Sequence, residues 1–124
     1  MRRALVSILV PFLAAAATPP SFDPVVFEEV AAARGLRFVT NSGRTPRKHQ
    51  PETMVAGVAV LDYDGDGWLD VYLVNGTALP ALEKTGPEYW NRLFRNDGKG
   101  SFTDVTEAAG VRGRGYDLGA VSAE

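Results

Sequence analysis

Short apolar runs alternate with polar turns through the second half of the chain. Apolar or alternating segments of this length, bounded by glycine and asparagine, are typical of β-strands. The pattern predicts four strands, at residues 55–61, 71–74, 92–95 and 101–105. The last two are joined by Asp97-Gly98-Lys99-Gly100, which predicts a hairpin because glycine accepts positive φ without strain.

Two segments of the chain recur. Residues 27–36 (FEEVAAARGL) return as 102–111 (FTDVTEAAGV), and residues 57–62 return as 119–124. Each copy of the first segment predicts a short strand followed by one helical turn, which Gly35 or Gly110 stops. The offsets differ by thirteen residues (102 minus 27 against 119 minus 57). The extra residues fall in the polar stretch 41–54, a predicted surface loop.

Four antiparallel strands that begin to recur match one blade of a β-propeller. The predicted fold is therefore all-β, an incomplete β-propeller with little more than one blade, since propellers need about four to eight blades. A single β-sandwich is the alternative. A propeller can close its ring with an N-terminal strand, and we hypothesise that residues 27–30 supply it. The expected organisation is a signal peptide at 1–17, a strand and polar loop at 18–56, the blade at 57–118 and the truncated start of a second blade at 119–124.

The N-terminus reads as an export signal. Arg2 and Arg3 precede an apolar run at residues 4–17, which ends in three alanines and is followed by a Pro-Pro pair. This order is typical of a secretory signal. The run is too short to span a bilayer, which takes about 20 residues, and it lacks the polar stripe of a buried amphipathic helix. The mature chain is expected to be secreted, periplasmic or at the cell surface, without a transmembrane segment.

Composition and charge narrow the possible partners. Hydrophobic residues make up 45% of the 124 residues and charged residues 23%, as in ordinary globular proteins. The net charge of -2 becomes -4 without Arg2 and Arg3 (eleven basic against fifteen acidic residues), so a nucleic acid is not an expected partner. Cysteine is absent, which excludes disulfides and thiolate metal sites.

The segment from Asp62 to Asp70 (DYDGDGWLD) carries the most specific chemistry. Carboxylates stand at loop positions 1, 3, 5 and 9, and a backbone carbonyl is available at position 7. Ca²⁺ takes six to eight oxygen ligands, and alternating aspartates on a sharply turning backbone can supply them. Carboxylates this close repel one another unless a cation neutralises them. The predicted calcium ligands are Asp62, Asp64, Asp66, the Trp68 carbonyl and Asp70.

A helix-flanked EF-hand begins in the same way, but its loop needs a glutamate at position 12. That position is Leu73, and the flanking segments are β-rich. The metal is therefore expected in the turn of a β-hairpin. Mg²⁺ is less favoured because it prefers a smaller octahedral site with several waters.

Residues 57–76, 91–98 and 102–110 together resemble the FG-GAP/VCBS repeats of the cartilage acidic protein (ASPIC/UnbV) family. Residues 51–54 are similar to the segment that precedes the first repeat in that family. The resemblance implies an exported, seven-bladed, integrin-α-like propeller with Ca²⁺ in its hairpin loops. It implies the same five ligands. The C-terminal domain of that family is absent from this chain, so no activity is transferred through it.

The function predicted from these features is an exported, calcium-binding scaffold that binds an unknown protein or glycan and does not catalyse a reaction. His49, the only histidine, lies in a loop without a triad-like spacing. The basic residues Arg44, Arg47 and Lys48 are interpreted as a solvated face, and Trp68, Tyr89 and Trp90 as packing residues. The alternatives are a hydrolase that uses the acidic loop as a catalytic metal centre, or a fragment that does not fold alone.

Overall fold

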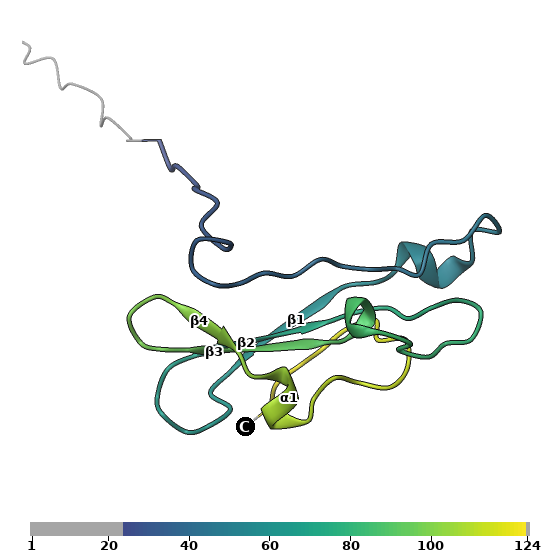
Figure 1. Ribbon diagram of the computed structural model, residues 1–124. Helices are drawn as coiled ribbons and strands as arrows, with labels where there is room; N and C mark the ends of the chain where they lie inside the picture. The colour runs from purple at the N-terminus through teal and green to yellow at the C-terminus, as the bar shows by residue number, and fades with distance from the viewer. Residues whose placement is uncertain (1–23, 124) are drawn as a thin grey trace, which may run out of the picture.

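The computed structural model describes residues 24–123, which are organised around one antiparallel sheet (Figure 1). Its four strands follow one another in the order β1-β2-β3-β4. Their bounds are β1 Gly57–Leu61, β2 Asp70–Val74, β3 Arg92–Asn96 and β4 Phe102–Asp104. The helical elements are η1 Gln50–Thr53, η2 Pro87–Tyr89 and α1 Thr106–Ala109.

The four predicted strands are confirmed, within one or two residues at their ends. A β-sandwich needs two sheets, whereas the described residues form one open sheet. The fold is thus all-β and corresponds to one blade of an incomplete propeller. Among the described residues, no helix is long and apolar enough to cross a membrane.

The hairpin between β3 and β4 forms where its turn residues predict it. The carboxylate of Asp97 accepts hydrogen bonds from the backbone N–H groups of Lys99 and Ser101, at 2.8 and 2.9 Å. Gly98 and Gly100 have φ values of +69° and +85°, which other residues adopt only with strain. Local chemistry is therefore sufficient to predict this turn.

Helix α1 also forms as predicted and ends at Gly110, which has a φ of +70°. The helix is fixed to β3 by two bonds: the Leu93 N–H donates to Thr106 Oγ1 at 2.9 Å, and the Val105 N–H donates to the Leu93 carbonyl at 2.9 Å. Thr106 is fully buried. The β4-α1 connection is consequently bonded directly to the middle of the sheet.

The two faces of the sheet are covered by different parts of the chain. Ala59, Tyr72 and Leu93 are aligned across β1, β2 and β3, and α1 and the C-terminal segment lie on their side. The chain that precedes β1 runs along the other side (Figure 1), where Phe94 is the most buried apolar residue of the core. One blade is thereby partly enclosed by its own flanking segments.

Residues 27–30, predicted as a ring-closing strand, form no strand in this structure. They pair with none of the four strands, and Phe27 is 92% exposed. Their role in closing a ring stays a prediction. The helical turn that follows does form, and it ends at Gly35 with a φ of +91°. The Arg34 carbonyl accepts the Phe102 N–H at 2.7 Å, so the first copy of the repeated segment is bonded to the second.

Residues 119–123 lie beside β1 without forming a strand of their own. Ser122 Oγ donates to the Val60 carbonyl at 3.1 Å. A Cβ on Gly57 would lie 2.6 Å from the Gly119 Cα, whereas a Cβ on Gly119 would meet no atom within 4 Å, so the glycine at position 57 permits the close approach of the two backbones. The role of this segment in a second blade stays a prediction.

Candidate metal centre

The acidic loop, residues 62–70, connects β1 to β2, and the strands set its two ends. Leu61 and Asp70 are paired across the two strands, so the loop starts and finishes at neighbouring backbone positions. Gly65 and Gly67 have φ values of +75° and +87°. A Cβ at either glycine would meet no atom within 4 Å, so glycine is required there for backbone conformation and not for space.

Asp62 organises the backbone of the loop. Its Oδ1 accepts the N–H groups of Gly65 and Asp66 at 2.8 and 3.1 Å, and its Oδ2 accepts that of Gly67 at 2.9 Å. Charge-assisted bonds to a carboxylate are stronger than neutral ones. The first residue of the acidic pattern therefore wraps the loop around its own side chain.

Asp70 ties the loop to the rest of the sheet. It is fully buried, and its two oxygens accept the N–H groups of Tyr63 and Asn96 at 2.9 and 2.8 Å. The Asn96 side chain in turn donates to the Leu69 carbonyl at 3.1 Å. The last residue of the loop is thus fixed from both sides, by the loop and by β3.

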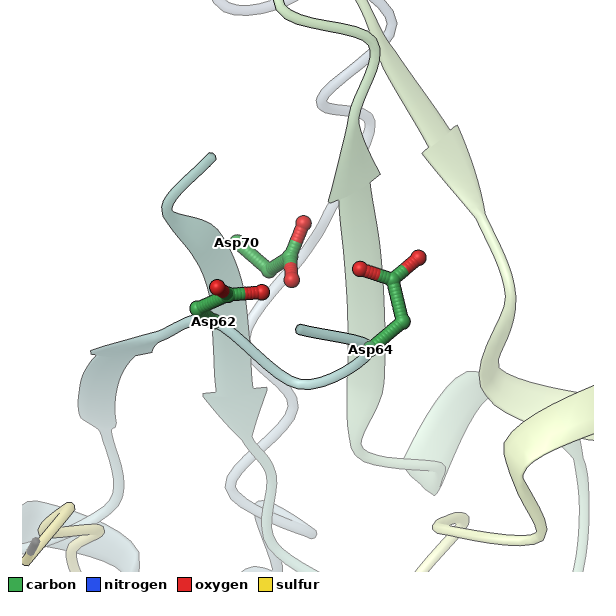
Figure 2. Close-up of side chains that lie close together, drawn as sticks. All are labelled: Asp62, Asp64 and Asp70. Carbon is green, nitrogen blue, oxygen red and sulfur yellow. The ribbon is translucent and has the colours of Figure 1, made fainter. Parts of the chain in front are cut away.

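Three carboxylates converge in this loop. One oxygen each from Asp62, Asp64 and Asp70 lies within 4.8 Å of the others, and Figure 2 shows the three side chains gathered at the same point of the loop. At that separation and an effective dielectric constant of about 20, two charges repel by roughly 3 to 4 kcal/mol. The nearest ion-pair partner is Arg95, 3.9 Å from Asp64 and half exposed. This oxygen donor set fits a hard divalent cation such as Ca²⁺.

The other two predicted ligands behave differently. Asp66 lies outside the group of three carboxylates, and its Oδ1 accepts the Trp68 N–H at 2.9 Å. The Trp68 indole is 52% exposed and lies against Gly98, where a Cβ would come within 2.6 Å of the ring. The ligand roles of Asp66 and the Trp68 carbonyl, like those of the three gathered aspartates, stay predictions.

Asn96 is a residue of the site that the sequence did not single out. It stands at the end of β3, remote from the acidic loop in sequence, and its backbone and side chain both donate to that loop. The only feature of the sequence that marks Asn96 is its position directly before the Asp97-Gly98 turn, and this does not indicate a contact with the acidic loop. The contact depends on the pairing of β2 with β3, which no local pattern specifies.

The remaining candidates lie elsewhere. His49 borders a pocket of about 340 Å³ whose residues belong to the loop around η1. Trp90 packs against two guanidinium groups, with the Cζ atoms of Arg112 and Arg92 at 4.0 and 5.5 Å from its ring. Trp90 is half-buried between these two arginines, and its packing between blades stays a prediction.

The sequence model of the FG-GAP-like repeat matches residues 62–123, which are 62 of the 124 residues. The chain belongs to the FG-GAP-like repeat family. The matched range begins at the first carboxylate of the acidic loop and continues through β2, β3, β4 and α1. In this FG-GAP-like repeat, the acidic loop therefore opens the region that defines the family. No curated protein and no solved structure matches the chain.

Proposed function

We propose that this FG-GAP-like repeat is an exported, calcium-stabilised scaffold that binds a protein or glycan and has no catalytic role. The observation that carries the calcium part is the convergence of three carboxylate oxygens within 4.8 Å on one hairpin loop. FG-GAP repeats commonly mediate protein or ligand binding and occur in extracellular and surface proteins. The ASPIC/UnbV resemblance and the N-terminal signal pattern support export; residues 1–17 lie outside the described residues.

Bound Ca²⁺ would supply positive charge at the point where the three carboxylates meet. Asp62, Asp64 and Asp70 would hold it, with Asp66 and the Trp68 carbonyl completing the oxygen set. Asp62 and Asp70 are already fixed by backbone N–H groups, so ordering them costs little when the ion binds. The strands on either side of the loop would then be tied at their ends.

The calcium site is tested by titrating the full chain with Tb³⁺, a luminescent substitute for Ca²⁺. Trp68 lies within the loop and serves as the donor for energy transfer. We expect saturable terbium luminescence that Ca²⁺ displaces. Asp64→Asn should weaken binding by about tenfold or more, because affinity in such loops follows the number of ligand charges.

Two variants sharpen this test. Asp66→Asn tests whether Asp66 belongs to the ligand set. If this variant weakens terbium binding as much as Asp64→Asn does, Asp66 is a ligand; if it does not, the three carboxylates hold the ion. Asp97→Asn is the matched control, because that carboxylate lies in the neighbouring hairpin and outside the group of three. Absence of luminescence and of any heat on calcium addition would contradict the proposal.

A further inference from the structure

A buried lysine occupies the end of β2 that is remote from the acidic loop. The Lys84 side chain is 3% exposed. Its Nζ donates to the backbone carbonyls of Asn75, Gly76 and Tyr89, at 2.8, 3.0 and 2.9 Å. A lysine ammonium has three donors and no acceptor, so these carbonyls satisfy it almost completely. Buried lysines are rare unless they are paired.

The partner of this ammonium comes from the C-terminal part of the chain. Asp117 Oδ2 lies 3.2 Å from Lys84 Nζ, and the same oxygen accepts a bond from Asn91 Nδ2 at 2.8 Å. The Asp117 N–H donates to the Asn75 carbonyl at 3.3 Å. Burial lowers the pKa of Lys84, and the Asp117 carboxylate opposes that shift. Asp117 therefore meets Lys84, Asn91 and Asn75 at one point.

Asp117 belongs to a segment that lies across the sheet without regular structure of its own. We name residues 111–118 the strap. At its other end, the Val111 carbonyl accepts the Tyr72 hydroxyl at 3.1 Å, and the Arg112 carbonyl accepts the Asn91 N–H at 3.0 Å. The strap also borders an apolar pocket of about 420 Å³, lined by Leu61, Tyr63, Tyr72, Leu93, Ala109 and Val111.

These contacts distribute the attachment of the strap unevenly. Near Val111 and Arg112 it is held by two neutral hydrogen bonds, by an exposed Arg112–Glu107 ion pair at 3.0 Å and by the contact of Arg112 with Trp90, each of modest net strength in water. The Tyr116 hydroxyl adds a bond to the chain before β1, since it lies 2.7 Å from the Pro51 carbonyl. Near Asp117 the strap is held by a charge pair whose cation is buried, which is costly to break from one side. Segments with few buried apolar contacts open locally well before the whole domain unfolds. The charge pair is thus the attachment of the strap whose loss from one side leaves a buried charge without its partner.

We propose that the Lys84 ammonium is an internal cation that latches the strap to the sheet through Asp117. Loss of the latch lets the Asp117 end of the strap leave the sheet while the four-stranded sheet stays folded. This device is independent of the calcium site, because it lies at the opposite end of β2.

The test is hydrogen exchange of backbone amides in the full chain. Lys84→Met keeps most of the apolar stem and removes the ammonium, together with its bonds to the three carbonyls and to Asp117. The Asp117 and Asn91 N–H groups report on the two ends of the strap, and we expect their exchange to become at least about tenfold faster. The amides of β2 should exchange as in the wild type. Lys99→Met is the matched control, since Lys99 is exposed in the β3-β4 turn.

A second variant covers the case in which Lys84→Met does not fold. Asp117→Asn removes the charge of a side chain that is 34% exposed, and it should accelerate exchange of the same two amides. In the double variant the effects should be less than additive, because each single change already breaks the pair. A folded Lys84→Met or Asp117→Asn protein with wild-type exchange at the Asp117 amide would overturn the proposal, as would full additivity.

Discussion

The aspartates at the two ends of the acidic loop do different work, although the sequence pattern treats them alike. Asp62 is exposed and folds the loop through three N–H groups. Asp70 is buried and joins the loop to β3 through Asn96. Removal of the Asp62 carboxylate would loosen the loop alone. Removal of the Asp70 carboxylate would also leave the Asn96 N–H of β3 without its acceptor. A substitution at Asp70 therefore reports on folding as well as on metal binding.

The Thr106 hydroxyl makes one of the two hydrogen bonds that fix α1 to β3, and its loss should be measurable. Thr106→Val keeps the size of a fully buried side chain but leaves the Leu93 N–H without the acceptor that it has at 2.9 Å. An unsatisfied buried donor costs about 1–3 kcal/mol. We expect the free energy of unfolding, measured by urea denaturation, to fall by that amount.

Two further variants separate the hydrogen bond from other effects of valine. Thr106→Ser retains the hydroxyl and should recover most of the loss. Thr103→Val makes the same exchange at an exposed position of β4 and should leave stability nearly unchanged. If Thr106→Val and Thr103→Val unfold at the same urea concentration, the bond to Leu93 contributes nothing.

At the scale of elements, the sequence predicts the turns and helix ends that depend only on neighbouring residues. The turn at Asp97-Gly98 needs a short-range acceptor and glycines, and Gly110 needs only a left-handed conformation to end α1. Residues 27–30 form no strand here, because a strand needs a neighbour and an apolar pattern says nothing about whether one is present; their role in closing a ring stays a prediction. The contacts of Asn96 with the acidic loop and of Lys84 with Asp117 could not be predicted either. Each joins residues far apart in sequence and depends on how the strands and the C-terminal segment are placed.

The loop around η1 is an element whose stability should depend on pH. Glu52 accepts the Thr45 hydroxyl at 2.7 Å, and also the N–H groups of Thr45 and His49 at 3.1 and 2.8 Å. The bond from the Thr45 hydroxyl is the largest cause that lowers the pKa of Glu52 below 4.5. A depressed carboxyl pKa adds stability above pH 4.5 and loses it as the pH falls through the folded value.

The measurement is a pH titration of the Glu52 side-chain carboxyl by NMR. We expect its midpoint below 4.5 and a parallel change in the Thr45 amide signal, since the two groups share a hydrogen bond. Thr45→Val removes the hydroxyl and should move the pKa of Glu52 back toward 4.5. A midpoint at or above 4.5 in the unmodified chain would show that the carboxylate is not held by these donors in solution.

In the whole molecule, the two ends of the sheet are held by different means. The β1-β2 and β3-β4 loops meet at one end, where carboxylates repel one another and Asn96 and Trp68 join the loops. At the other end, Asn75, Asn91 and Lys84 form a satisfied polar network. Every fully enclosed side-chain polar atom among the described residues has a hydrogen-bond partner. Charge repulsion at the acidic end is thus the strain that a cation would relieve.

Calcium should therefore raise the melting temperature of the whole chain. A ligand that binds only the folded state stabilises it by RT ln(1 + [L]/Kd). With a Kd of about 10⁻⁴ to 10⁻³ M, as in extracellular loops, 10 mM Ca²⁺ adds about 1.4–2.7 kcal/mol. For a domain of this size that corresponds to a Tm increase of roughly 5–20 °C. Calorimetry in calcium and in EDTA measures it, with equal Mg²⁺ as the control for ionic strength and Asp64→Asn as the variant that should lose the increase. Equal melting in calcium and EDTA would mean that the three carboxylates tolerate their own repulsion and that the fold does not depend on the ion.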